Sequence, residues 1–291
     1  MSHIPITIAA YILNGISVTI DKFLITKKIP DPLIYIFYYS IVSLVALLLL
    51  PFVKTPSLNV LITASVSTIL WSSAAYFMLK ALQTGQVSRV IPIVGTLNPV
   101  ILLAVAFAAS AITLNQTLGV VLLIAGMVFL TLMDWQGDMS KKELILEITS
   151  ASLFALSYLV LRQAYLMDNF LSVFVWSRPI LIPVGLALLA IPKTRKIVLN
   201  LEGPKINIFS KAGALFAVGQ LSGGISELML IFAISLANPV LVNSLQGTQY
   251  IFLFILSLLL AKKFPEVFKE RFTKLTITSK SFGIVLIAIG L

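Results

Sequence analysis

Residues 87–109 read VSRVIPIVGTLNPVILLAVAFAA, and Arg89 is the single charged residue among them. A helix needs about 20 consecutive apolar residues to cross the hydrocarbon core of a membrane. The two prolines and the glycine in this stretch do not argue against a helix, because membrane-spanning helices tolerate both residue types. The stretch therefore predicts a transmembrane helix.

Composition extends this prediction to the whole chain. Of its 291 residues, 59% are hydrophobic and 11% are charged, whereas about a quarter of the residues of a soluble domain carry a charge. So few charges cannot cover a water-exposed surface, and we expect lipid to surround most of the chain. The absence of cysteine excludes disulfides and thiolate catalysis.

Ten apolar stretches are each expected to form a membrane-crossing helix. They cover residues 4–25, 33–53, 58–80, 87–109, 116–133, 147–166, 171–191, 211–236, 239–260 and 277–291. The first stretch lacks the basic start and the small-residue cleavage site of a signal peptide, so we interpret it as a retained helix. The expected fold class is an all-α integral membrane protein without a soluble domain.

The two halves of the chain repeat each other, which predicts one five-helix repeat over residues 1–137 and a second over residues 138–291. Val94-Gly95-Thr96 aligns with Gln246-Gly247-Thr248 at an offset of 152 residues. Near its end, each half also carries two glycines seven residues apart: Gly119 and Gly126, then Gly283 and Gly290. Glycines at this spacing share one helix face and allow close packing. An odd number of helices per repeat makes the two halves inverted in the membrane.

Lysine and arginine are unevenly divided between the two sides that this topology predicts. Of 21 such residues, 18 fall on the side of the connections that join helices 1 and 2, 3 and 4, 5 and 6, 7 and 8, and 9 and 10. The other side holds Lys54 and Arg162. Because basic loops stay in the cytoplasm, we expect a plasma (inner) membrane protein with both termini outside the cytoplasm. The net charge of +10 then reflects orientation and anionic lipid, and no nucleic-acid partner is expected.

Polar side chains inside the membrane are the best functional candidates, because burying them there is costly. Glu227 and Arg178 are the charged examples. Two stripes at helical spacing mix amides, glycines and a carboxylate: Gln220, Gly223, Gly224 and Glu227 on residues 211–236, and Asn243, Gln246, Gly247 and Tyr250 on residues 239–260. Two such stripes on consecutive helices predict a polar cavity between them.

The equivalent stripes of the first half are mostly apolar or small, and aromatic side chains there are expected to form a cavity wall. The predicted substrate-binding residues are Trp71, Tyr76, Asn98, Trp176, Arg178, Gln220, Glu227, Asn243 and Gln246. Structural roles stay open beside these binding roles. Glu227 either pairs with Arg178 to hold two helices together or binds substrate or a coupling proton. The amides either join helices or contact ligand, and the aromatic side chains either pack or line the cavity.

Signatures of enzymes are absent from the sequence. It contains no Walker loop and no Gly-x-Ser-x-Gly elbow, and its one histidine, His3, lies at the N-terminus. We therefore expect no catalytic residue, no metal site and no cofactor.

Several short runs resemble the EamA-type pattern of the drug/metabolite transporter superfamily. They are Met78-Leu79-Lys80-Ala81, Gln86-Val87-Ser88, Leu97-Asn98-Pro99-Val100, Leu118-Gly119 to Ala125-Gly126, and Phe174-Val175-Trp176-Ser177-Arg178. Two elements of the pattern are missing: Phe37-Tyr38-Tyr39 lacks the arginine of the first half, and Ser110-Ala111-Ile112 replaces a Gly-Glu-Arg. The resemblance implies a ten-helix, inverted-repeat secondary transporter of small organic metabolites with a central cavity. Many relatives are thought to keep both termini in the cytoplasm, whereas the charge distribution predicts the opposite.

Three functions stand as hypotheses. The first is export or exchange of a small polar metabolite, such as an amino acid, by alternating access. A proton gradient or substrate exchange would drive it; Glu227 would bind a cationic group or a proton, and Arg178 would bind a carboxylate or set the charge state of Glu227. The second is a flippase for a lipid-linked substrate. The third is a membrane receptor or assembly subunit that transports nothing.

Overall fold

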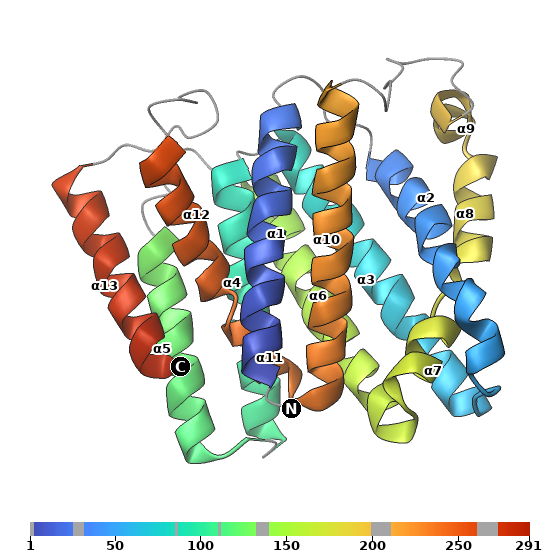
Figure 1. Ribbon diagram of the computed structural model, residues 1–291, viewed down its shortest axis with the longest axis horizontal. Coiled ribbons are helices and arrows are strands. Elements are labelled where there is room, and N and C mark those ends of the chain that lie inside the picture. The colour runs from blue at the N-terminus through green and yellow to red at the C-terminus, as the bar shows by residue number, and fades with distance from the viewer. Residues whose placement is uncertain are drawn as a thin grey trace. The chain divides into compact units, whose positions relative to one another are not determined.

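The computed structural model describes residues 3–25, 32–84, 87–109, 112–131, 140–198, 211–260 and 273–291, and within them it contains helices and connections but no β-strand. The elements, shown in Figure 1, are α1 (His3–Ile25), α2 (Pro32–Ser43), the 3-10 segment η1 (Leu44–Phe52), α3 (Leu58–Thr84), α4 (Val87–Ala108), α5 (Leu114–Thr131), α6 (Lys141–Met167), α7 (Phe170–Trp176), α8 (Leu181–Ala190), α9 (Pro192–Val198), α10 (Lys211–Leu236), α11 (Pro239–Ser244), α12 (Gly247–Leu260) and α13 (Lys274–Gly290).

A helical segment covers each apolar stretch expected from the sequence. Three stretches are divided between two segments each, namely α2 and η1, α7 and α8, and α11 and α12. Seven stretches of the described residues are long and apolar enough to cross a membrane, and Tyr39–Phe52 and Leu221–Leu236 are shorter apolar stretches. The chain is therefore an all-α, membrane-embedded protein.

The helices form two compact units. Unit 1 contains α1, α4, α5 and α10 to α13, and unit 2 contains α2, η1, α3 and α6 to α9. Each unit takes helices from both sequence halves. The packing units therefore differ from the predicted repeats over residues 1–137 and 138–291, because a helix can pack against a partner from either half.

In unit 1, two serine hydroxyls join α1 to α10, which lie side by side in Figure 1. Ser17 Oγ donates a hydrogen bond of 2.8 Å to the carbonyl oxygen of Gly219. Ser226 Oγ donates one of 2.8 Å to the carbonyl oxygen of Ala10. The contacts lie seven residues apart on each helix, and the residue numbers run in opposite directions, so the pair is antiparallel. Hydrogen bonds of this kind between membrane helices stabilise by about 0.6 kcal/mol on average.

In unit 2, α3 and α6 form a pair with the same two contacts. Ser67 Oγ donates to the carbonyl oxygen of Ser157 at 2.9 Å, and Ser150 Oγ donates to that of Ala74 at 2.9 Å. Adding 152 to the bonded α3 positions, 67 and 74, gives the bonded α10 positions, 219 and 226. Adding 140 to the bonded α1 positions, 10 and 17, gives the bonded α6 positions, 150 and 157. The bonded positions of the two helix pairs thus correspond, with donor and acceptor exchanged.

Glycines bring α5 and α13 of unit 1 into backbone contact. A Cβ atom on Gly126 would lie 2.7 Å from the carbonyl oxygen of Gly283, and one on Gly290 would lie 2.9 Å from that of Gly119. Either distance is too short for a real Cβ atom. The close packing predicted for these four glycines is therefore confirmed.

Candidate functional site

Polar side chains from several helices of unit 1 meet in a region that we call the polar cluster. Its members are Tyr11 of α1, Asn98 of α4, Glu227 of α10, Asn243 of α11, Gln246 at the junction of α11 and α12, and Tyr250 of α12. Four of the six were predicted as site residues from the sequence, and Tyr250 belonged to the predicted stripe on residues 239–260.

The break between α11 and α12 positions two of these side chains. Asn238 caps α11, because its side chain accepts a hydrogen bond of 3.1 Å from the backbone N–H of Val240, and Pro239 occupies the first turn, where a missing N–H costs nothing. The helix ends at Ser244 after only 6 residues, and α12 begins at Gly247. Gln246 is therefore presented from a short non-helical junction.

Asn243 lies at the centre of the polar cluster and is 3% exposed. Its Oδ1 accepts hydrogen bonds from Asn98 Nδ2 at 3.1 Å and from the Tyr11 hydroxyl at 3.5 Å. Its Nδ2 donates to the carbonyl oxygen of Pro239 at 2.9 Å. Hydrogen bonding between helices, one of the two roles left open for this amide, is thus present and holds the side chain in one orientation.

Asn98 keeps an acceptor that the described residues do not satisfy. The side chain is 6% exposed, and its Oδ1 is buried without a hydrogen-bond partner among them. A buried polar atom in this condition costs about 1–3 kcal/mol. An ammonium or hydroxyl group of a ligand could remove that cost by donating to Asn98.

Gly95 lets α4 approach the second amide. A Cβ atom at Gly95 would collide with the Tyr250 hydroxyl and with the Gln246 amide, so both side chains pack directly on the α4 backbone. The Tyr250 hydroxyl also donates a hydrogen bond of 3.4 Å to the carbonyl oxygen of Ile91. Backbone atoms of α4, and not side chains alone, therefore contact Gln246 and Tyr250.

Glu227 supplies the carboxylate of the polar cluster. It is half-buried, and electrostatic interactions connect Tyr11 with both Glu227 and Tyr250. One turn before it, a Cβ atom on Gly224 would meet no atom within 4 Å, so the helix faces open space there. A carboxylate in a membrane helix can bind a proton or a cationic group.

The two predicted stripes were expected to face each other across a cavity, but the described contacts of each are with another helix. Gly223 packs against Ser17 of α1, and the stripe containing Asn243 and Gln246 packs against α4. The packing partners of the stripe residues depend on where glycines allow close approach, which helical spacing alone does not give. The side chain of Gln220 lies outside the described residues.

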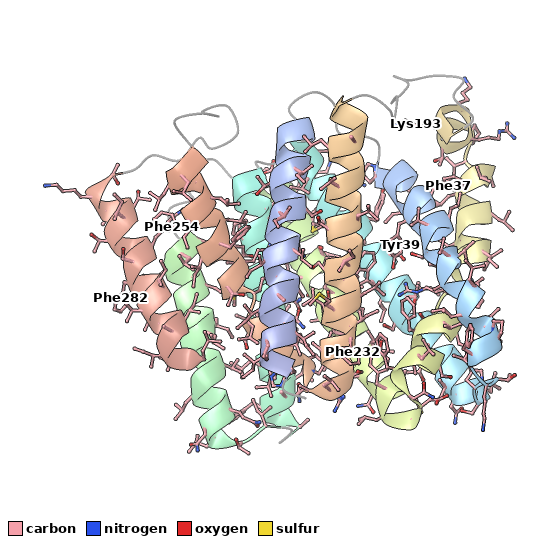
Figure 2. All side chains as sticks on the ribbon, viewed as in Figure 1. Phe37, Tyr39, Lys193, Phe232, Phe254 and Phe282 are labelled. Atoms are coloured by element: carbon pink, nitrogen blue, oxygen red, sulfur yellow. The ribbon has the colours of Figure 1, made fainter. Side chains whose placement is uncertain are left out.

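The remaining predicted residues belong to unit 2. Arg178 lies in the short junction between α7 and α8 and is 9% exposed. Its Nη1 donates a hydrogen bond of 3.1 Å to the hydroxyl of Tyr39, and its guanidinium carbon lies 4.7 Å from the centre of the Phe174 ring. Tyr39 projects from α2 (Figure 2). Because Glu227 belongs to unit 1, the pairing of Arg178 with Glu227 stays a prediction.

The predicted aromatic residues of unit 2 have different surroundings. Trp71 stacks on Tyr39, with ring centres 4.6 Å apart, and meets Phe154 edge to face at 5.8 Å. Tyr76 lies beside the Lys80 ammonium, which is 3.5 Å from its hydroxyl. Trp176 donates from Nε1 to the carbonyl oxygen of Lys54 at 3.0 Å, which ties α7 to the turn after η1. Trp71 is joined to Arg178 through a shared neighbour, Tyr39.

Sequence reasoning missed two charged residues that are fully enclosed. Glu147 is 0% exposed within α6, and it was overlooked because it seemed to begin the stretch 147–166. Lys280 was assigned to a basic connection, yet it lies inside α13, is 3% exposed, and places Nζ 5.2 Å from the centre of the Phe254 ring (labelled in Figure 2). Both residues nevertheless lie within the expected stretches 147–166 and 277–291, each within the first turn.

Comparison with known proteins bears on the fold alone. No protein-family model matches the chain, and no curated protein matches it. The chain is similar to a solved structure described as "Crystal structure of protein", with a TM-score of 0.63 and 13% identity over 97% of this chain and 97% of that one. At this identity the likeness shows that the chain shares a known helical fold along nearly its whole length.

Proposed function

We propose that the chain is a secondary transporter of small polar organic metabolites, such as amino acids, that works by alternating access. The observation that carries the proposal is the polar cluster of unit 1. Intramembrane polar groups are costly and are typical of substrate and ion pathways. In this cluster two asparagine side chains meet beside the interruption between α11 and α12, and Tyr11, which bonds to one of them, interacts electrostatically with the Glu227 carboxylate. Transporter sites are commonly built on such broken helices.

The proposed architecture is ten membrane-crossing helices in two inverted five-helix repeats. The exchanged serine contacts of the α1–α10 and α3–α6 pairs support it, because inverted repeats place equivalent contacts in different parts of a chain. The reciprocal glycine contact of α5 with α13 supports it as well, since these helices would be the fifth of each repeat. The resemblance to the EamA-type pattern points to the same architecture.

In this proposal Glu227 binds the coupling proton or a cationic group of the substrate, and the amides of Asn98, Asn243 and Gln246 orient the substrate. The sequence contains no nucleotide-binding loop, so the proton gradient or substrate exchange supplies the energy. The basic connections would face the cytoplasm and both termini the outside of the plasma membrane.

The test is flux of amino acids in reconstituted vesicles with and without a pH gradient. Glu227→Gln keeps the shape of the side chain but cannot bind a proton at neutral pH, so we expect it to abolish stimulation by the gradient. Glu143→Gln, at the start of α6 in unit 2, is the matched control and should behave like the wild type. Gradient-dependent flux that persists in Glu227→Gln would rule out the coupling role. Absence of flux in the wild type for every metabolite tried would favour the flippase or receptor hypotheses.

A further inference from the structure

Arg178 of unit 2 is a buried cation whose described partners carry no negative charge. Its guanidinium meets the Tyr39 hydroxyl and the face of the Phe174 ring, and its Nε is buried without a hydrogen-bond partner among the described residues. Guanidinium has five N–H donors and no acceptor. A cation enclosed in this way is strongly stabilised by any anion that reaches it.

A second unmet donor belongs to another neighbour of Tyr39, the indole of Trp71. The indole of Trp71 stacks on the Tyr39 ring, and its Nε1 is buried without a hydrogen-bond partner among the described residues. An indole N–H can only donate. Tyr39 therefore contacts two side chains that both offer N–H groups.

The chain itself is interrupted at this point. Residues 177–180 separate α7 from α8, and the carbonyl oxygen of Arg178 accepts a hydrogen bond of 2.9 Å from the N–H of Leu181 at the start of α8. Pro179 follows the arginine and has no N–H to continue the α7 ladder. The break fixes the backbone that carries the arginine, and the Phe174 ring and the Tyr39 hydroxyl fix its side chain.

We propose that Arg178, Tyr39 and the Trp71 indole N–H form an anion subsite for a carboxylate joined to an apolar or aromatic body. The planar guanidinium fork matches the two oxygens of a carboxylate. The rings of Tyr39, Trp71 and Phe174 surround the guanidinium and the indole N–H with aromatic side chains, which suits an apolar or aromatic body. This inference rests on the proposed function, because it names the substrate class of the transporter.

The experiment measures binding apart from transport, by the thermal unfolding midpoint of the purified protein in detergent. Sodium benzoate is the probe, sodium chloride at equal ionic strength controls for salt, and inorganic phosphate tests for a different oxyanion. We expect a saturable rise of the midpoint with benzoate, little with phosphate and none with chloride. Saturable stabilisation by phosphate in place of benzoate would overturn the assignment of a carboxylate.

Variants locate the binding. Arg178→Gln should abolish the benzoate response, and Arg178→Lys, which keeps the charge but loses the fork, should weaken binding about tenfold. Trp71→Phe keeps the ring and removes the N–H, and it should weaken binding about threefold to tenfold. Lys141→Gln, at the exposed start of α6, is the control and should leave the response unchanged. If Arg178→Gln and Arg178→Lys both fold and bind benzoate like the wild type, the proposal is wrong.

Flux distinguishes this inference from the proposed function. Benzoate binding that depends on Arg178 in a protein without any flux would reject the transporter and keep the anion subsite. Flux that continues in Arg178→Gln with unchanged KM for carboxylate substrates would keep the transporter and reject the subsite.

Discussion

Asn98 on α4 donates a hydrogen bond of 3.1 Å to Asn243 on α11. The offset of 152 residues between the predicted repeats relates this pair of positions to Tyr250 and Ile91. Both contacts are present, since the Tyr250 hydroxyl donates to the carbonyl oxygen of Ile91. In the first contact two amides meet, whereas in the second a phenol meets backbone. The contact of Asn98 with Asn243 therefore joins two polar side chains, whereas the contact of Tyr250 with Ile91 fixes a side chain to the backbone of α4.

Replacing Asn243 should disturb the polar cluster more than replacing either of its donors. In Asn243→Leu, the Asn98 amide and the Tyr11 hydroxyl both lose their shared acceptor, and we expect a loss of about 1–3 kcal/mol of stability. Tyr11→Phe removes one hydrogen bond of 3.5 Å and should cost less. Chemical unfolding of the two variants in detergent measures the difference, and equal losses would contradict the central role of Asn243.

Two glycine substitutions should have opposite effects. Gly126→Ala places a Cβ atom 2.6 Å from Ile287 Cγ1 and 2.7 Å from the carbonyl oxygen of Gly283, so α5 and α13 must separate. We expect a loss of about 1–3 kcal/mol, as for other overpacked contacts. Gly224→Ala meets no atom within 4 Å and should be neutral or stabilise by up to about 1 kcal/mol, because alanine favours helix. Unfolding midpoints check both, and similar values would show that α5 and α13 are not packed through Gly126.

If the two halves form a repeat, serines in equivalent contacts should contribute equally to the free energy of unfolding. Ser226→Ala and Ser150→Ala each remove one hydrogen bond between helices, and we expect each to cost about 0.6 kcal/mol. Thr63→Ala is the control, because the hydroxyl of Thr63 is exposed and bonds within its own helix to Asn59. Unfolding free energies that differ by more than about 1 kcal/mol between the two serine variants would speak against equivalent contacts.

The charge distribution predicts which ends of unit 2 face the cytoplasm. Lys54 and Lys193 are both exposed, and they fall on opposite sides of the expected topology. In intact cells, a membrane-impermeant maleimide should label Lys54→Cys but not Lys193→Cys. The reverse pattern would place both termini in the cytoplasm.

Trp176 is expected to act as an anchor. Trp176→Phe removes its hydrogen bond to the carbonyl oxygen of Lys54, and we expect a loss of about 1 kcal/mol of stability with no change in KM for transported substrates. A raised KM with unchanged stability would assign Trp176 to the binding site instead.

Much of the fold could be predicted because each helix must be apolar along its whole length. The spacing of seven residues within each glycine pair was also evident from the sequence. These four glycines form the close contact between α5 and α13. Helix interruptions were harder to foresee. The proline after Arg178 marks one break, but nothing in the local sequence distinguishes it from Pro92 and Pro99, which lie inside the continuous helix α4.

The candidate site was predicted in part. Asn98 and Asn243 were both identified as polar positions, and the structure joins them. Tyr11 and Tyr39 were missed, because a tyrosine in an apolar stretch gives no sign of whether its hydroxyl meets a partner far away in the chain. Tyr11 bonds to a residue 232 positions away, a separation that a pattern within one helix does not reveal.

Gly224 also gives the protein a ready attachment point. The chain has no cysteine, so a single cysteine placed there carries a fluorophore or spin label without competition. The position lies one turn before Glu227 and has no atom within 4 Å of a Cβ atom, so a label there displaces no described neighbour. Its signal would then report changes in the surroundings of α10, one turn from Glu227, while a proton or ligand binds.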